Sequence, residues 1–314
     1  MQPGTGTDVA AMAATAVTVL LWASAFVAIR SAGHDFGPGA LALGRLLAGS
    51  VVLGVIAAVR REGLPPRAAW PGIAGFGVLW FGVYMVALNW GEQQVDAGTA
   101  SMTTSSIPLL VVVLSGLLLG EGFPRRLLGG IAVSGTGTVL VGLAASQGGR
   151  APLTGVLLCL LAAIGAACAQ IAQKSALQHG SALQVTTFGC LIGTAVTLPF
   201  AGQLVRQLAA APADATLSVL YLGVFPTALA FTTWAFALAR NTAGRTAAAI
   251  YLIPAIVVLL SWLLLNEVPR PLSCVGGALC LAGVAITRLR WRSIGRAKRQ
   301  KVAAGCNGRR ARAV

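Results

Sequence analysis

The segment GTASMTTSSIP, residues 98–108, gathers hydroxyl side chains in an otherwise apolar region. On a helix, Thr99, Thr103 and Ser106 lie on one face, because residues three and four apart stand above one another. Polar groups in apolar surroundings need hydrogen-bond partners, which neighbouring helices or a bound molecule could supply. The stripe therefore predicts hydrogen bonding rather than catalysis. Both a solute site and packing between helices without a ligand remain open.

Further candidates for binding a small molecule lie in the neighbouring apolar segments. Tyr84 and Asn89 fall near the end of one segment, and Asn89 is one of few amides among the apolar stretches. Trp22 and Trp234 would supply aromatic walls or anchor helices at an interface. The predicted substrate-binding residues are Trp22, Tyr84, Asn89, Thr99, Thr103, Ser106, Trp234 and Tyr251.

Two prolines accompany these candidates. Pro108 cannot donate a hydrogen bond to the carbonyl of Thr104, and Pro254 has the same relation to Ile250. We predict a helix kink at each proline, because the ring displaces the preceding turn.

The charged residues suggest supporting roles. Arg45 is the clear charge within an apolar stretch, where it would contact a helix-end carbonyl, reach the interface, or attract a substrate carboxylate or phosphate. Glu121 and Glu267 end two apolar stretches and are predicted to be structural caps, with proton handling as the alternative. No Asp or Glu is expected deep within such a stretch.

Known catalytic patterns are missing from the sequence. The two histidines, His34 and His179, fall in expected loops, and no HExxH or paired-Asp motif is present. None of the six cysteines shows metal-ligand spacing. We therefore predict no enzyme activity, no catalytic residue, no metal and no cofactor.

The composition defines the surroundings of all these residues. Of the 314 residues 56% are hydrophobic and 10% charged, whereas a soluble domain carries about 25% charge. Continuous apolar stretches of about 20 residues match a bilayer-spanning helix, not the alternating strands of a barrel. We predict an all-α integral membrane protein with ten transmembrane helices, at residues 9–29, 38–59, 70–90, 97–119, 127–145, 153–173, 184–204, 217–239, 244–265 and 271–287.

The basic residues predict the orientation. Residues 1–8 carry no positive charge, so the first stretch is read as a helix and not as a signal peptide. With the N-terminus inside, Lys and Arg concentrate in the inside loops and the basic tail, as cytoplasmic segments do. Both termini are therefore expected in the cytoplasm, with anionic lipid rather than nucleic acid as the partner of the tail.

Two segments nearly repeat each other. IPLLVVVLSGLLLGE begins at Ile107 and IPAIVVLLSWLLLNE begins at Ile253, 146 residues later. Gly137 and Gly283 match at the same offset, and WASAFVAIRS has a weaker counterpart 144 residues on. Five predicted spans separate the copies, so the two must cross the bilayer in opposite directions. We predict two inverted five-helix repeats, residues 1–149 and 150–290, followed by a basic cytoplasmic tail at 291–314.

These motifs resemble the drug/metabolite transporter superfamily, EamA type. The similarity rests on LLWASAFVAIR, LALGRLLAG, AGTASMTTSSIPLLVVVLSGLLLGE and AGRTAAAIYLIPAIVVLLSWLLLNE. It implies ten helices, cytoplasmic termini and the export or exchange of small organic solutes, and it leaves the solute undefined. The family often has Arg at the place of Arg45.

The expected function is therefore that of a secondary transporter. Inverted repeats suit alternating access, since two similar halves give two similar states. The solute would be an amino acid, a related metabolite or a toxic compound, exported across a bacterial inner membrane. A structural or signalling membrane protein without transport is the alternative. Gly116 and Gly120 have GxxxG spacing, which would also suit a homodimer.

Overall fold

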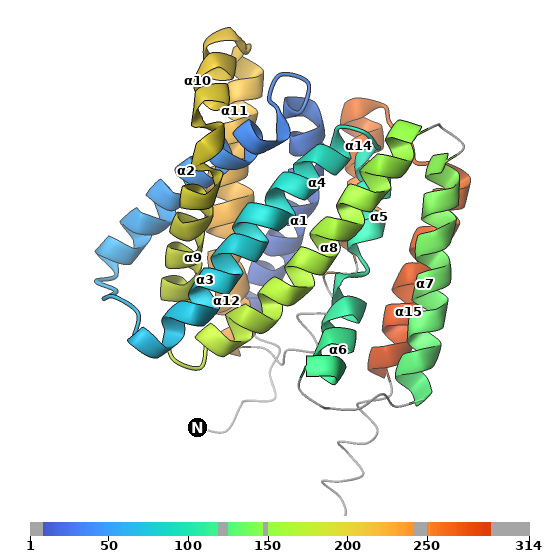
Figure 1. Cartoon of the computed structure of the whole chain (residues 1–314), viewed down its shortest axis with the longest axis horizontal. Coiled ribbons are helices and arrows are strands. Elements are labelled where there is room, and N and C mark those ends of the chain that lie inside the picture. Colours follow the sequence, from blue (N-terminus) through green and yellow to red (C-terminus); the bar gives the residue numbers. More distant parts are fainter. Residues whose placement is uncertain (1–8, 119–124, 147–149, 241–249, 251, 290–314) are drawn as a thin grey trace, which may run out of the picture.

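The computed structural model describes residues 9–118, 125–146, 150–240, 250 and 252–289, and within these ranges all regular structure is helical (Figure 1). This confirms the all-α prediction for the part of the chain described. The elements are α1 (Val9–Ala32), α2 (Pro38–Val59), η1 (Arg67–Ala69), α3 (Trp70–Phe76), η2 (Gly77–Tyr84), α4 (Met85–Glu92), α5 (Ala97–Thr104), α6 (Ile107–Leu118), α7 (Arg125–Ser146), α8 (Arg150–Ala176), α9 (Ala182–Thr197), η3 (Leu198–Phe200), α10 (Ala201–Ala210), α11 (Ala213–Leu222), η4 (Gly223–Leu229), α12 (Ala230–Arg240), α14 (Ile253–Leu265) and α15 (Pro271–Leu289).

Several helices are long and apolar enough to cross a bilayer. The described residues contain six, namely Val9–Ala32, Pro38–Val59, Arg67–Glu92, Leu153–Ala176, Ala182–Ala210 and Ala213–Trp234. Shorter apolar helices occupy three more predicted spans, at Ala132–Val141, Ile253–Leu265 and Pro271–Gly283. Because each such segment satisfies its backbone hydrogen bonds internally, a helix is the form that these sequences can take in lipid.

The fourth predicted span, 97–119, is not one continuous helix. α5 ends at Thr104 and α6 begins at Ile107, with a turn at Ser105 and Ser106 between them. Pro108 therefore lies in the first turn of α6, where its missing N–H has no helical partner to lose. Pro254 has the same place at the start of α14. In both segments the proline lies in the first turn of a described helix, and the predicted kink at Pro254 stays a prediction because residues 241–249 and 251 lie outside the described part of the chain.

Two of the described segments have π-helical geometry, and their first residues are separated by the same offset as the sequence repeat. η2 starts at Gly77 and η4 starts at Gly223, 146 residues later. A Cβ atom at Gly77 would lie 2.7 Å from the carbonyl oxygen of Gly189, and one at Gly223 would lie 2.5 Å from that of Arg45. These glycines therefore allow η2 to pack closely against α9, and η4 against α2.

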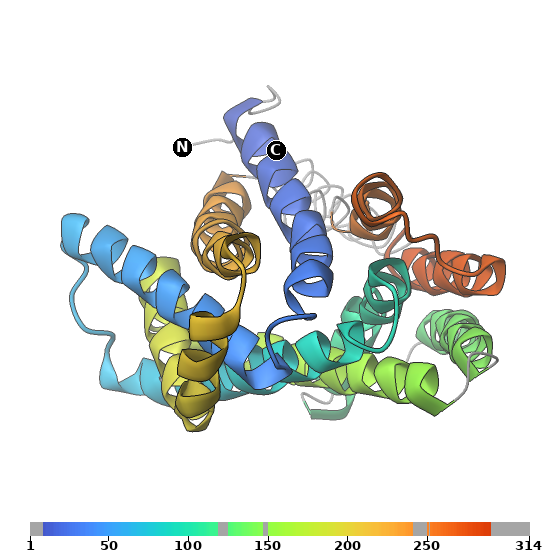
Figure 2. The ribbon, with the colours of Figure 1, turned by 90° about the horizontal axis from the view of Figure 1, so that it is seen from above.

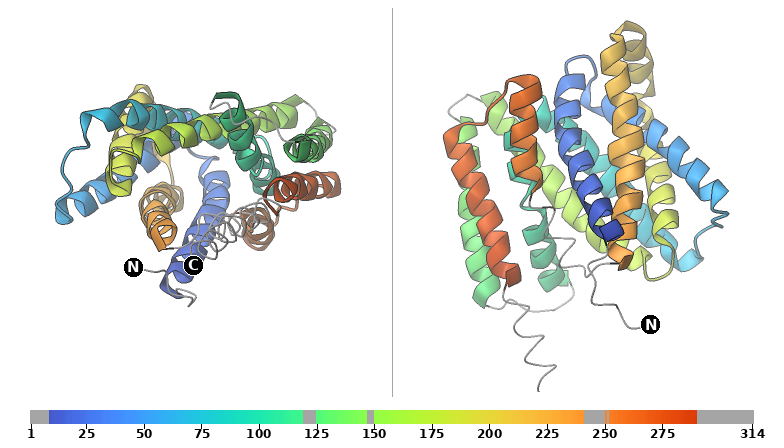
Figure 3. Two further views of the ribbon diagram at one scale, coloured as in Figure 1. Left: turned by 90° about the horizontal axis from the view of Figure 1, so that it is seen from below. Right: turned by 180° about the vertical axis from the view of Figure 1, so that it is seen from behind.

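α7 and α15 pack along each other (Figure 3). A Cβ at Gly137 would meet the carbonyl oxygen of Gly276, and one at Gly283 would lie 2.7 Å from the carbonyl oxygen of Gly130. The two contacts are reciprocal, because Gly283 follows Gly137 by 146 residues and Gly276 follows Gly130 by the same interval. Small residues at such a crossing let two helix backbones come together in a membrane.

The bundle has two ends that the contacts distinguish. At one, which we call the Arg30 end, Arg30 lies beside Glu267, and the Gly37 amide donates to Gln207 Oε1 at 3.0 Å. At the other, the Arg60 end, Ser181 Oγ donates to Glu62 at 3.0 Å. Seen from above, α7 and α15 lie together on one side of the bundle, and α2 and α9 on the other (Figure 2).

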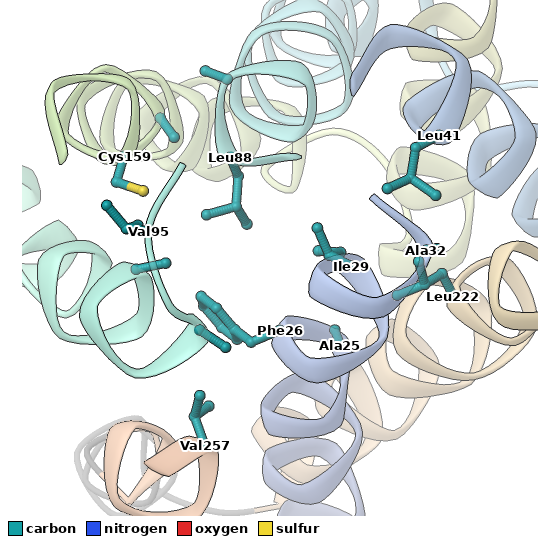
Figure 4. Close-up of a cluster of buried hydrophobic side chains, with 14 of the residues drawn as sticks. Ala25, Phe26, Ile29, Ala32, Leu41, Leu88, Val95, Cys159, Leu222 and Val257 are labelled. Carbon is teal, nitrogen blue, oxygen red and sulfur yellow. The ribbon is translucent and has the colours of Figure 1, made fainter. Parts of the chain in front are cut away.

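A buried apolar cluster joins the helices near the Arg30 end (Figure 4). Phe26 and Ile29 of α1 belong to it, together with Leu88 of α4, Val257 of α14 and Leu222 of α11. These side chains come from both halves of the sequence. The cluster therefore holds the two halves together on this side of the molecule.

The glycine contact between α7 and α15 predicts a selective effect of added methyl groups. Replacing Gly137 with Ala should lower the free energy of unfolding by about 1–3 kcal/mol, the usual effect of overpacking. Gly135 is the matched control on the same helix, because nothing lies within 4 Å of its added Cβ. Gly135→Ala should be neutral or slightly stabilising. Thermal unfolding in detergent measures both, and equal shifts of Tm would contradict the proposed packing.

Candidate functional site

Aromatic rings from three elements meet inside the bundle. Trp22 of α1 lies 5.3 Å from Trp234 and 5.6 Å from Phe231, both of α12, between ring centroids. Trp80 of η2 lies 5.1 Å from Tyr84 and 5.9 Å from Phe231. Phe231 is buried, whereas the other four side chains are partly exposed. The cluster thus presents ring surface that its own packing does not cover.

The π-helical segment η2 positions part of this cluster. Trp80 and Tyr84 are four residues apart in η2, and Phe76, in the turn before it, lies 6.0 Å from Trp80. Segments of this geometry are frequent at functional sites, because the wider turn changes the direction of the side chains. Trp22, Tyr84 and Trp234 are predicted site residues, whereas Trp80 and Phe231 are not, since nothing in their local sequence distinguishes them from other aromatic residues of apolar segments.

Arg45 lies next to this cluster and is buried within the bundle. Its side chain is 5% exposed, and its Nε donates to Thr227 Oγ1 of η4 at 2.8 Å. The Thr227 hydroxyl in turn donates to the carbonyl of Leu222 at 2.8 Å. Arg45 also interacts electrostatically with Tyr84 and Glu92. A fixed guanidinium of this kind can bind a carboxylate or phosphate group.

Two residues of α4 add polar atoms that have no partner. Asn89 is completely buried, and its Nδ2 donates to the carbonyl of Pro38 at 3.1 Å, while its Oδ1 accepts no hydrogen bond. Glu92 is also 0% exposed, and neither carboxyl oxygen has a hydrogen-bond partner. Glu92 is the last residue of α4, which continues two residues beyond the predicted segment 70–90, so it lies at a helix end and not deep within a span.

Arg30 links three elements at the end of the bundle that bears its name. Its Nε lies 3.0 Å from Glu267 Oε1, and its Nη1 donates to the backbone carbonyl of Glu92 at 2.8 Å. Asn266 precedes Glu267 with φ 54°, a left-handed conformation that Asn tolerates better than most residues. This turn ends α14 and places Glu267 beside α1. Arg30 was not among the predicted site residues.

The hydroxyl stripe of α5 bonds mainly to its own segment. Thr99 Oγ1 donates to Asp96 at 2.7 Å, Thr103 Oγ1 to the carbonyl of Thr99 at 2.8 Å, and Ser106 Oγ to the carbonyl of Thr103 at 2.8 Å. Asp96 also accepts from the Thr99 amide and so caps the helix. All three hydroxyl residues are buried. Their donors are used locally, so the stripe can offer a solute only its remaining acceptor sites.

Some predicted residues lie outside the described part of the chain. These are Tyr251, Glu121 and the basic tail at 291–314. Among the residues that the structure does describe, no group of three or more His, Cys, Asp or Glu could hold a metal ion.

The comparisons with known proteins agree with one another. The EamA-like transporter family matches residues 9–143 and again residues 153–289. A probable terminal-alkyne amino-acid exporter of Streptantibioticus cattleyicolor is 36% identical over 278 residues, which cover 88% of this chain and 93% of that protein.

More distant relatives extend the comparison. An uncharacterized transporter of Bacillus subtilis is 34% identical over 86% of this chain and 88% of its own length. A probable amino-acid metabolite efflux pump of Escherichia coli is 25% identical over 88% of this chain and 94% of its own. One protein of known crystal structure matches the fold with a TM-score of 0.59 and 21% identity, over 92% of this chain and 99% of that one.

The hydrogen bond of Arg45 predicts a stability effect at Thr227. Thr227→Val would leave Arg45 Nε and the Leu222 carbonyl without their shared partner, at a cost of about 1–3 kcal/mol for buried groups. Thr232→Val is the matched control, because the Thr232 hydroxyl donates to the carbonyls of Ala228 and Leu229, one turn earlier in the chain, and not to another part of the bundle. Thermal unfolding should separate the two variants. A Thr227→Val protein as stable as the control would show that this bond does not hold Arg45.

Proposed function

The chain belongs to the EamA-like transporter family, and on this premise we propose that it exports a small organic solute by alternating access. The solute is an amino acid, a related metabolite or a toxic compound, and the membrane is a bacterial inner membrane. Relatives named as amino-acid exporters or efflux pumps support this solute class. The family comprises transporters rather than enzymes, and the apolar helices identify a multi-pass membrane protein.

The architecture that we propose is ten transmembrane helices in two inverted halves, residues 1–149 and 150–290. Two separate matches to the same family, one in each half, support it. The π-helical segments that start at Gly77 and Gly223, and the reciprocal contacts of Gly137 and Gly283, support a twofold relation between the halves. Such a relation favours two states of similar energy, each open to one side.

The observation that carries the proposal is the buried polar and aromatic site at the junction of the halves. Arg45 from the first half bonds Thr227 from the second, and Trp22 packs against Trp234. Charges within a membrane protein are costly and generally mark the path of a substrate or ion. Arg45 suits the carboxylate of an amino acid, Asn89 offers a free acceptor, and the partly exposed rings suit an apolar side chain.

Opening and closing would occur at the two ends of this site. At the Arg30 end, the Arg30–Glu267 ion pair connects the halves across 237 residues of sequence. The buried cluster of Figure 4 adds apolar contacts between side chains from both halves. We therefore assign the structure to the state in which the Arg30 end is closed.

The proposed orientation places the Arg60 end and both termini in the cytoplasm. Arg60, Arg61 and Arg67 lie at that end, whereas Asp35, Asp96 and Glu267 lie at the other. The basic residues of 291–314 would then face the anionic lipids of the inner leaflet. A homodimer through small-residue helix faces stays a prediction.

A transport measurement tests the proposed site. L-Propargylglycine, a small amino acid with a terminal alkyne, is the first probe, with L-phenylalanine and L-threonine as comparators in proteoliposomes. Trp234→Ala and Asn89→Ala should each slow transport of the accepted probe roughly tenfold, the effect of losing about 1.4 kcal/mol of interaction. Trp262→Ala is the control, because this side chain is 54% exposed on α14.

The results of this transport measurement distinguish the proposed site, and transport itself, from the alternatives. Unchanged rates in both site variants would place the solute elsewhere. If no probe moves in proteoliposomes, and cells that overexpress or lack the gene release the same metabolites, the structural or signalling alternative is favoured instead.

A labelling experiment tests orientation and inversion. Val268 is 64% exposed at the Arg30 end and Leu64 is 77% exposed at the Arg60 end. In intact cells an impermeant maleimide should label Val268→Cys and should reach Leu64→Cys only after lysis. A short tag inserted after Glu121 should behave like Leu64→Cys. If the tag and Val268→Cys were both reached from outside, the inverted-repeat proposal would fail.

A further inference from the structure

Glu92 is a buried carboxyl group that the structure leaves without a direct partner. It ends α4, its side chain is 0% exposed, and both carboxyl oxygens lack hydrogen bonds. Among the described residues, Arg30 and Glu267 form an ion pair with 3.0 Å between Nε and Oε1, and Glu92 is not part of this pair. An ionised carboxylate buried without a partner is highly unfavourable. The conformation shown therefore accommodates Glu92 as the neutral acid.

The charged groups that face Glu92 are bound to other partners. Arg45 of α2 and Arg30 of α1 both interact with it electrostatically. Arg45 nevertheless donates its Nε to Thr227, and Arg30 contacts Glu267 and the backbone carbonyl of Glu92. The remaining ionisable groups around Glu92 are Glu267 after α14, Asp96 before α5, Tyr84 of η2 and Cys159 of α8.

We propose that Glu92 binds the proton that this transporter exchanges for its solute. The inference rests on the proposed export function and adds a coupling ion and a residue to it. With the Arg30 end open, Glu92 takes one proton from outside as the solute leaves. With the Arg60 end open, Glu92 releases that proton inward as the next solute binds. One proton enters for each solute that leaves.

Burial supplies the coupling. Closing the Arg30 end removes Glu92 from water, so an empty, ionised site closes only at a large cost. A proton removes the charge, and a cationic group of the solute compensates it. The transporter can therefore change between its two open states while Glu92 holds either a proton or a solute. It cannot do so while Glu92 is ionised and the site is empty. Arg45 contributes a positive charge nearby, which allows Glu92 to lose its proton once water has access.

Asn89 indicates which solute group would replace the proton. It lies three residues before Glu92, so both side chains lie on the same side of α4. Its unpartnered Oδ1 and the Glu92 carboxylate are both acceptors. An ammonium group donates to such a pair, while Arg45 suits a carboxylate. The favoured solute class is therefore a zwitterion, with its ammonium at Glu92 and Asn89.

The first test measures coupling in proteoliposomes that contain labelled L-propargylglycine on both sides at equal concentration. A gradient of one pH unit can sustain a solute ratio of about tenfold in one-for-one exchange. The wild type should approach this ratio, and its lumen should change pH as the solute moves. Glu92→Gln should reach a ratio near one, and it should exchange solute between equal pools more slowly than the wild type, because the solute's ammonium loses its counter-charge. Glu92→Asp keeps a carboxyl group and should respond to the gradient.

Asp214→Asn is the matched control, since this carboxylate is exposed in the first turn of α11. It should behave like the wild type. A Glu92→Gln protein that still accumulates solute against its gradient would overturn the inference. A wild type that exchanges solute without any response to pH would also overturn it, while the proposed export function would stand.

A second test needs no solute. Infrared difference spectra of the purified protein, recorded while pH is changed, should show the carbonyl stretch of a protonated carboxyl group. The band should be missing in Glu92→Gln and present in Asp214→Asn. If the wild type moves none of the probes, the export proposal fails for them and this spectrum still decides the role of Glu92. A wild-type spectrum without the band, or a band that persists in Glu92→Gln, would refute the proposal.

Discussion

The interior of a membrane protein offers almost no water to a charged side chain, and this constraint governs where the charges of the chain can lie. Arg45 is buried where Thr227 can accept from it, and Arg30 lies where Glu267 and a backbone carbonyl face it. Each partner comes from a distant part of the sequence. The charged groups therefore act as links between the two halves, and any movement of the halves changes their surroundings.

Close contact between helices makes those links available. Glycines at the crossings of η2 with α9, of η4 with α2 and of α7 with α15 bring backbones within van der Waals contact. In lipid the apolar faces gain little from association by themselves, so close packing and polar contacts carry the stability. The small residues that dominate this sequence are thus a condition for burying Arg45, not merely a consequence of its hydrophobic composition.

Several features could be predicted from the sequence because they depend on local composition. The helical class and most spans follow from apolar length, and Trp22 and Trp234 do lie together. Glu92 lies just beyond the predicted span 70–90, and composition alone cannot show that other helices cover it. The Arg30–Glu267 pair spans 237 residues, so local patterns carried no signal for it. The hydroxyl residues of α5 could be identified from the sequence, but their hydrogen bonds to carbonyls of the same segment could not be predicted from it.

The differences between the halves carry the most information about mechanism. At an offset of 144 residues, Gly189 is the position equivalent to Arg45. At an offset of 146 residues, Phe81 is equivalent to Thr227, and Leu238 is equivalent to Glu92. The backbone contacts are shared, whereas most of the ionisable groups near the site belong to the first half. A symmetric scaffold gives two conformations of similar energy, but it does not require two equal sites. One polar site at the junction can bind a solute and be exposed to each side in turn, because the second half supplies the matching backbone and the apolar surface against which the first half moves.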